Sequence, residues 1–132
     1  ATAQTANQLL RFDLADPAAP TLAATHDVGP APWHPTFGPD GRTLYFGNKG
    51  ANTVTAFDTQ TETATVIADD AFAQPHGSAL GPDGRFLYVS NNNTADGTDA
   101  NGRVVVIDTQ TNQIAAVIEV GTNPTGVGVR QP

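Results

Sequence analysis

The chain has 132 residues and a turn-rich composition, with 13 glycines, 10 prolines and only 14% charged residues, which predicts one compact all-β domain without a long helix. Its formal net charge of −7, with only six Lys and Arg, argues against binding to nucleic acid and to anionic membranes, because both need a basic surface. The lack of cysteine excludes disulfides, thiolate metal sites and attached c-type haem, and no apolar run approaches the roughly 18 residues of a membrane-inserted helix.

Three segments of the chain share one pattern, an Asn followed by an apolar strand that ends in Asp. They are Asn7–Asp13, Asn52–Asp58 and Asn101–Asp108. Each is followed by a connection and then by a weaker, more polar strand. These weaker strands are predicted at Thr21–His26, Thr63–Ala68 and Gln113–Val120. Their composition predicts that they are the outermost and most exposed strands of each repeat.

Two hairpins precede the second and third of these segments. The stretch Gly38–Asn48 and its near copy Gly81–Asn91 each contain Pro-Asp-Gly, a tight-turn sequence, and then a strand rich in aromatic and β-branched residues. A Pro and a short strand come before each hairpin, at Pro32 and Pro75, and a third such start occurs at Pro124. These prolines are 43 and 49 residues apart, close to the roughly 40–50 residues of one four-stranded propeller blade.

The repeat predicts an all-β fold, a β-propeller of four-stranded antiparallel blades, with about three blades in this single segment. The end of the first blade occupies 1–31, the next two blades occupy 32–74 and 75–123, and 124–132 supplies the first strand of another. The Gly-rich first strands belong near the axis, whereas the middle strands, apolar on successive residues, are buried on both faces. Because propellers have roughly 4 to 8 blades, we expect either a partial propeller or one unit of an assembled ring.

With Pro-Asp-Gly-Arg, Leu-Tyr-Val-Ser-Asn and Val-Val-Val-Ile-Asp in register, nearly the whole chain resembles the YVTN family of β-propeller repeats. The motif that names the family stands at Tyr88–Asn91 and, in a more distant form, at Tyr45–Asn48. The resemblance implies a seven-bladed propeller of the kind found in periplasmic, surface-layer and secreted proteins. A chain that opens with Ala-Thr-Ala and no Met also fits a protein whose signal peptide has been cleaved, and a proteolytic boundary is the alternative. We therefore expect a periplasmic, cell-surface or secreted protein.

The best candidates for a binding site are Trp33, His34 and His76, because they stand at the starts of first strands, where a propeller places residues at the mouth of its channel. They are expected to contact a ligand or partner; the alternative is packing at the blade junctions. Neutral imidazoles also suit copper or zinc, provided that they converge on one ion. In the repeat Trp33 aligns with His76, so His34 lies one residue further along and the imidazoles need not converge. His26, in an outer strand, is expected to be exposed.

The loop Asn91–Gly102 offers oxygen ligands for calcium, among them Asp96 and Asp99. It lacks the closing Glu of an EF-hand, because Arg103 stands there, and a solvated loop is the alternative. Other carboxylates recur in the repeats, and repetition predicts turn formation instead of catalysis. They are Asp40, Asp58, Asp83 and Asp108. The sequence contains no nucleophile elbow, P-loop or zinc-protease motif.

From this lack of recognisable chemistry we predict an exported, non-enzymatic module without a cofactor that binds a protein or a glycan. One alternative is a metal-handling (copper) or electron-transfer protein that uses His34 and His76, and another is a lactonase-like hydrolase formed only by the complete ring. Further blades of the same propeller, or other copies of the chain, are also expected as partners. They would cover the apolar face formed by Leu9, Leu10 and Phe12.

Overall fold

The structure is a computed structural model that describes residues 1–94 and 100–130. In these residues it contains eleven β-strands and no helix, so the expected all-β class is confirmed and no helix of a length to cross a membrane is found. The strands are β1 (Thr2–Ala3), β2 (Gln8–Asp13), β3 (Thr21–Asp27), β4 (Pro32–Phe37), β5 (Thr43–Asn48), β6 (Thr53–Asp58), β7 (Thr63–Ala68), β8 (Pro75–Leu80), β9 (Phe86–Asn91), β10 (Asn101–Asp108) and β11 (Gln113–Thr122).

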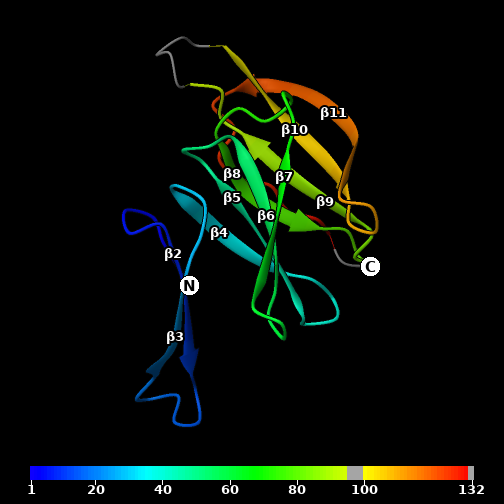
Figure 1. Cartoon of the computed structure of the whole chain (residues 1–132). Coiled ribbons are helices and arrows are strands. Elements are labelled where there is room, and N and C mark those ends of the chain that lie inside the picture. The colour runs from blue at the N-terminus through cyan, green and yellow to red at the C-terminus, as the bar shows by residue number, and fades with distance from the viewer. Residues whose placement is uncertain (95–99, 131–132) are drawn as a thin grey trace.

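The strands form three antiparallel sheets, in which neighbours along the chain are neighbours in the sheet (Figure 1). The N-terminal sheet has the order β1-β2-β3, the middle sheet β4-β5-β6-β7 and the C-terminal sheet β8-β9-β10-β11. Consecutive four-stranded antiparallel sheets of this kind are the blades of a propeller, and the three-stranded sheet has the same up-and-down order. The chain is thus a partial β-propeller, as its repeat predicts.

Hydrophobic side chains pack between successive sheets and leave β5 buried on both faces. On one face, Leu44 and Phe46 belong to the same cluster as Leu9 of the N-terminal sheet. On the other face, Tyr45 belongs to the cluster that contains Leu87 of the C-terminal sheet. All five side chains are at most 5% exposed. Burial on both faces explains why this middle strand is apolar on successive residues, and it confirms the expectation from the sequence.

The outer strands differ from the middle strands as their composition predicts. In β7 only Ile67 is buried, and no residue of β11 is buried. Large apolar side chains on these strands, such as Val66 and Val117, are about half exposed or more. The outer strands therefore contribute hydrogen bonds to the sheets and little to the core.

Residues 124–130 do not form the strand that the sequence predicts. They pass close to the inner strand β8, where a Cβ atom on Gly77 would lie 2.8 Å from the carbonyl oxygen of Thr125. A strand needs a hydrogen-bonded neighbour, and no strand in the described part of the chain pairs with this segment. The missing side chain at Gly77 allows the segment to lie close to β8, and Nδ2 of Asn92 donates to the carbonyl oxygen of Pro124 at 2.8 Å.

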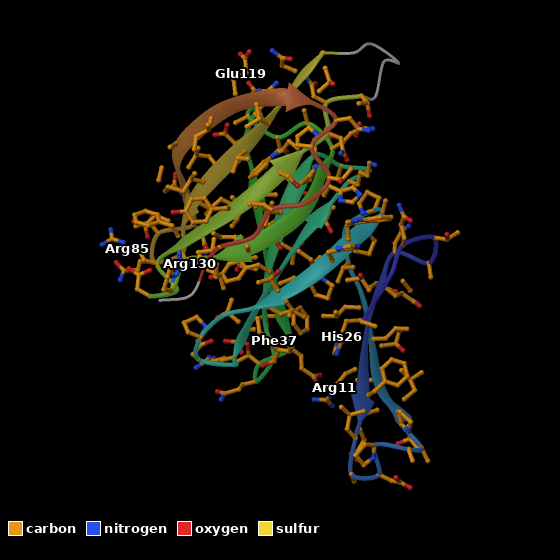
Figure 2. The ribbon with its side chains drawn as sticks, turned by 180° about the vertical axis from the view of Figure 1, so that it is seen from behind. Arg11, His26, Phe37, Arg85, Glu119 and Arg130 are labelled. Atoms are coloured by element: carbon orange, nitrogen blue, oxygen red, sulfur yellow. The ribbon has the colours of Figure 1, made fainter. Side chains whose placement is uncertain are left out.

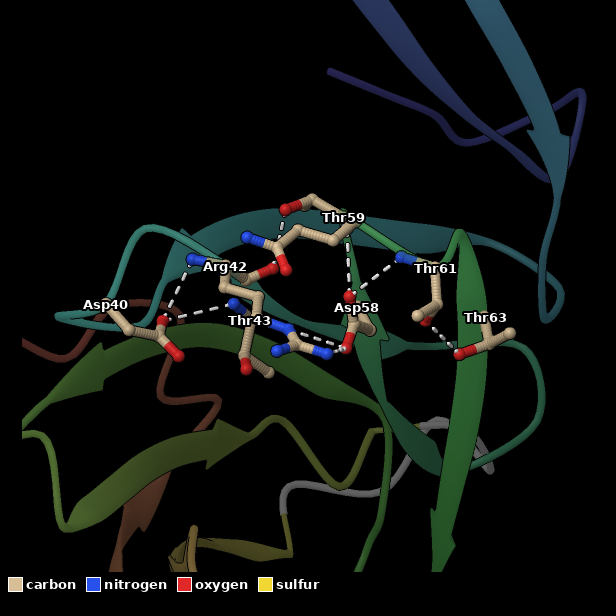
Figure 3. Close-up of polar contacts among 8 residues, drawn as sticks. Asp40, Arg42, Thr43, Asp58, Thr59, Thr61 and Thr63 are labelled. Atoms are coloured by element: carbon tan, nitrogen blue, oxygen red, sulfur yellow. Dashed lines mark hydrogen bonds and ion pairs between the residues drawn. The ribbon is translucent and has the colours of Figure 1, made fainter.

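Carboxylates hold the Pro-Asp-Gly turns, and Figure 3 shows the turn of the middle sheet. Asp40 accepts hydrogen bonds from the backbone N–H groups of Arg42 and Thr43, at 2.9 and 3.2 Å. The Arg42 side chain donates from Nε to Oδ2 of Asp58, 2.8 Å away at the end of β6. The second oxygen of Asp58 accepts from the N–H of Thr61 at 3.0 Å, in the next turn. One arginine thus ties two turns of the blade together.

The C-terminal sheet repeats this ion pair, with Nη2 of Arg85 at 2.8 Å from Oδ2 of Asp108. In both sheets the arginine guanidinium lowers the pKa of the aspartate that it binds, Asp58 at the end of β6 and Asp108 at the end of β10. Hydrogen bonds from backbone N–H groups lower the pKa further, by a smaller amount. The repeated carboxylates therefore act in turns, as their repetition predicts.

We expect the free energy of unfolding to fall as the pH drops below about 4. The folded protein keeps Asp58 and Asp108 ionised at a lower pH than the unfolded chain does. The stabilisation of the fold by these two carboxylates is therefore complete above their pKa in the unfolded chain. It is lost as the pH falls through their lower pKa in the folded protein. Urea unfolding between about pH 2 and 7 compares the parent with the Asp58→Asn/Asp108→Asn variant. The variant is expected to be less stable at neutral pH and to depend less on pH, and two parallel curves would contradict the assignment.

Candidate functional site

The inner strands β4 and β8 begin in the same way. The residue before the first Pro of each strand has a left-handed backbone, with φ of 52° at Ala31 and 57° at Gln74. The N–H of Ala31 donates to Oδ1 of Asn7 at 3.0 Å, and the N–H of Gln74 donates to Oδ1 of Asn52 at 2.7 Å. Because each Asn comes from the preceding sheet, the starts of β4 and β8 are both positioned by the neighbouring blade.

Both inner strands also break register just after they begin. The pairing of β4 with β5 shifts between Trp33 and Thr36, and the pairing of β8 with β9 shifts between Pro75 and Ser78. His34 lies in the irregular part of β4 and has φ of 22°, which residues other than glycine rarely adopt. Irregularities of this kind change the direction of side chains relative to the regular ladder.

The side chains of Trp33, His34 and His76 form one cluster across the two sheets. The rings of Trp33 and His34 are stacked, with centroids 5.4 Å apart and an interplanar angle of 2°. His76 is tilted against both rings, with its centroid 4.8 Å from that of Trp33 and 5.6 Å from that of His34. The alignment of the repeats did not show whether His34 and His76 lie close together. The structure places their rings side by side.

Lys49 is a fourth member of the cluster that the sequence analysis did not single out. Its Nζ lies 5.8 Å from the centre of the Trp33 ring. It is the only lysine of the chain, and it forms no ion pair with any residue that the structure describes. The signal that could have found it is the hairpin register: Trp33 pairs with Gly47, and Lys49, two residues further along, shares the face of Gly47. The cluster is locally cationic in a protein of negative net charge.

The environment of His76 favours its neutral form. Burial lowers the pKa of its imidazole, and the nearby Lys49 and His34 add to this effect, while a hydrogen bond to the backbone of Thr125 opposes it. Nδ1 of His76 and Nε1 of Trp33 are buried and have no hydrogen-bond partner among the described residues. Buried polar atoms without a partner are uncommon and call for a ligand, a water or a functional explanation.

The other candidates do not join this cluster. His26 is not exposed as the sequence predicts: its side chain is 17% exposed and its ring centroid lies 5.1 Å from that of Phe57, because the N-terminal sheet leans on the middle sheet. The calcium candidates Asp96 and Asp99 lie outside the described residues. Residues 1–94 and 100–130 contain no group of three side chains suited to a metal ion, and the copper or zinc alternative stays a prediction.

A family model described as lactonase, seven-bladed β-propeller, matches residues 6–126 of the chain. The chain belongs to this lactonase propeller family. The match covers the strands from β2 to β11 and the Trp33, His34, Lys49 and His76 cluster. The family confirms the propeller that the repeat predicts, whereas the narrower YVTN assignment stays a prediction.

Solved structures resemble the chain over most of its length. Hydrazine synthase of Kuenenia stuttgartiensis is 39% identical, with a TM-score of 0.63, and the match covers 74% of this chain and 25% of that chain. A putative 6-phosphogluconolactonase from Bacteroides uniformis ATCC 8492 is 24% identical, with a TM-score of 0.70 and coverages of 93% and 38%. The dihydro-heme d1 dehydrogenase NirN in complex with DHE is 22% identical, with a TM-score of 0.71 and coverages of 98% and 27%. The chain thus spans between a quarter and two fifths of these structures, and no curated protein matches it.

The prediction that the protein is not an enzyme is wrong. The lactonase family is named for an enzyme activity, and the similar structures include proteins named as a lactonase and as a dehydrogenase. The prediction relied on short catalytic motifs within one stretch of sequence. In a propeller, functional groups come from separate blades, so they are spaced by about one repeat and form no such motif.

Proposed function

We propose that the protein is a lactone-hydrolysing enzyme whose substrate binds at the cluster of Trp33, His34, Lys49 and His76. The observation that supports this most is the combination, in a lactonase-family chain, of a half-buried imidazole with a lowered pKa and a lysine that forms no ion pair with any described residue. The cluster lies at the start of the inner strands, where two imidazoles, an indole N–H and an ammonium group converge.

Hydrolysis of a lactone adds water across the ester bond of its ring. His76 is the proposed general base, because a neutral imidazole accepts a proton from the attacking water. The water oxygen forms a bond with the carbonyl carbon, and the carbonyl oxygen takes up negative charge. When the bond between the acyl carbon and the ring oxygen breaks, the proton passes from the imidazole to that oxygen, and a hydroxy acid is released.

Two donors of the cluster suit the negative charge that develops on the carbonyl oxygen. Lys49 carries a positive charge, and Trp33 has an indole N–H without a partner among the described residues. His34 is the most exposed of the three rings and is the proposed contact for the rest of the substrate. Aromatic faces combined with several N–H groups fit a hydroxylated lactone, such as the lactone of a sugar acid.

Further blades, from the same polypeptide or from another copy, complete the ring around this cluster in our proposal. Its support is the seven-bladed family and the greater length of the similar structures. An exported location is also part of the proposal, and it is supported by a composition that contains a single lysine and many Thr, Asn and Gln residues.

A screen of lactones tests the proposed activity. The purified protein is mixed with sugar lactones and with unsubstituted lactones of the same ring size, and acid release is followed with a pH indicator. We expect hydrolysis above the spontaneous rate, with a preference for the hydroxylated rings. A rate equal to that of buffer for every lactone would contradict the proposal.

A further inference from the structure

A hollow of about 320 Å³ lies between the outer parts of the middle and C-terminal sheets. Residues 65–69 of β7 and just after it form one wall. Residues 111–114, in the turn from β10 to β11 and at the start of β11, form the other wall. We call this hollow the β7–β11 pocket. Both sheets that form it have four strands, so it belongs to the junction between two whole blades.

One polar atom of the pocket lining has no partner. Oδ1 of Asn112 is buried and accepts no hydrogen bond from the residues that the structure describes. The turn holds Asn112 in place, since its φ is 56° and its backbone N–H donates to the carbonyl oxygen of Asp108 at 2.8 Å. A buried carbonyl oxygen without a donor is unfavourable. The amide can therefore turn towards a donor in the pocket, and Oδ1 loses no hydrogen bond when it does so.

The junction between the N-terminal and middle sheets shows what binds at the equivalent position. Glu62 corresponds to Asn112, because both residues follow the sequence Asp-Thr-Gln-Thr, and its φ of 57° is nearly the same. Its Oε1 lies 3.1 Å from Nη1 of Arg11 and 4.0 Å from Nε2 of His26, both in the preceding sheet. Figure 2 shows Arg11 and His26 on the side of the β2–β3 hairpin that faces Phe37. At this junction the turn residue binds a guanidinium group.

The second junction retains the acceptor but lacks the donor. Aligned strand by strand, the middle sheet has Ala56 at the position of Arg11 and Ile67 at the position of His26. Neither of these apolar side chains can donate a hydrogen bond to Asn112. The guanidinium that the preceding blade supplies at the first junction is thus missing at the second.

The pocket also contains a negative charge. Asp69 is part of its lining, and its Oδ1 accepts from the N–H of Ala71 at 2.8 Å, which occupies one of the two carboxylate oxygens. Asp69 forms no ion pair with any residue of 1–94 or 100–130. Ile67 and Ile114 supply apolar parts of the walls. The lining therefore suits a cationic group that is carried on a short alkyl chain.

We propose that the β7–β11 pocket binds the guanidinium group of an alkylguanidinium ligand, either a small molecule or an arginine side chain. The planar guanidinium has five N–H donors and can bind Oδ1 of Asn112 and the carboxylate of Asp69 at the same time. Its alkyl chain packs against Ile67 and Ile114. An alkylammonium is a compact, strongly hydrated charge and fits this arrangement less well. The pocket is separate from the Trp33 cluster, so the proposal does not rest on the proposed hydrolysis.

An NMR titration of the isotope-labelled protein with n-butylguanidinium chloride tests the proposal. We expect saturable shifts of the side-chain amide of Asn112 and of the backbone amides of β7, with one ligand per chain. The matched ligands are n-butylurea, which has a similar shape and no charge, and n-butylammonium. Each is expected to bind about tenfold more weakly or worse. Because this experiment uses the unaltered protein, it does not depend on the folding of a variant.

The peptide acetyl-Gly-Arg-Gly-amide distinguishes the two sources of the ligand. Binding as tight as that of n-butylguanidinium identifies an arginine side chain as the occupant, whereas weaker binding identifies a small alkylguanidinium. The absence of saturable shifts with n-butylguanidinium, or equal shifts with n-butylammonium, overturns the proposal.

Protein variants identify the contacts. Asn112→Gly removes the amide, keeps a residue that tolerates the left-handed backbone, and is expected to abolish the saturable shifts of β7. Asn112→Asp places a carboxylate there and is expected to strengthen binding several-fold at low salt. Asp69→Asn is expected to weaken binding several-fold, and its matched control is Asp70→Asn, which changes a neighbouring carboxylate outside the lining and is expected to bind like the parent. Parental binding by Asn112→Gly, or equal losses for the two Asp→Asn variants, contradicts the assignment.

Discussion

We expect the substitution Phe46→Ala to lower the free energy of unfolding by about 3–5 kcal/mol. Phe46 is fully buried between the N-terminal and middle sheets, in one cluster with Leu9, Leu44 and Phe57. Its backbone lies in β5, which is paired with β4 on one side and with β6 on the other, so the sheet cannot close the cavity that the missing ring leaves. The loss therefore contains both the transfer of the ring and the cavity. Urea unfolding followed by far-ultraviolet circular dichroism measures it.

Phe37→Ala is the matched control for this experiment. Phe37 is also in the middle sheet, but 59% of it is exposed, and its truncation is expected to change stability by no more than about 0.5 kcal/mol. Similar losses for the two Phe→Ala variants would show that the space between the first two sheets is not a packed core.

The second large effect concerns His76. We expect His76→Gln to lower the rate of lactone hydrolysis by about 10²–10⁴-fold, because Gln keeps hydrogen bonding and approximate size but cannot take a proton from water. The control is His26→Gln, which replaces the half-buried histidine that lies against Phe57 outside the cluster. Steady-state rates of the parent and both variants on the best lactone of the screen give the comparison. A His76→Gln enzyme that retains the parental rate would exclude this imidazole as the base.

The pH dependence of the parent separates a catalytic from a structural role of His76. Burial lowers the pKa of this imidazole, so its neutral form persists below the ordinary histidine value of about 6.5. The rate of hydrolysis is therefore expected to fall only when the pH drops below that value. The residual activity of His76→Gln is expected not to show this fall.

The lowered pKa of His76 also determines how this residue affects the stability of the fold as the pH falls. The unfolded chain binds the proton at higher pH than the folded protein, so this group reduces stability as the pH falls below about 6.5.

The sequence by itself determined the strands, the turns and the burial of the middle strands. These features are local: Pro-Asp-Gly specifies a tight turn, and an apolar run of strand length specifies a strand covered on both faces, as Leu44, Tyr45 and Phe46 show. The repeat of about one blade then specified the propeller. Even the turn role of Asp58 followed from its recurrence, because a group present in every blade serves what every blade needs.

The tertiary structure alone decided which residues meet. Lys49 joins Trp33 and His76 because a hairpin register and a contact between two sheets bring together chain positions that are far apart, and no local pattern records this. His26 is half-buried, although its strand has an exposed composition, because the burial of an outer strand depends on how far its sheet leans on the next one. Residues 124–130 have the composition of a strand but no partner in the described chain, and a strand is stable only with a hydrogen-bonded neighbour.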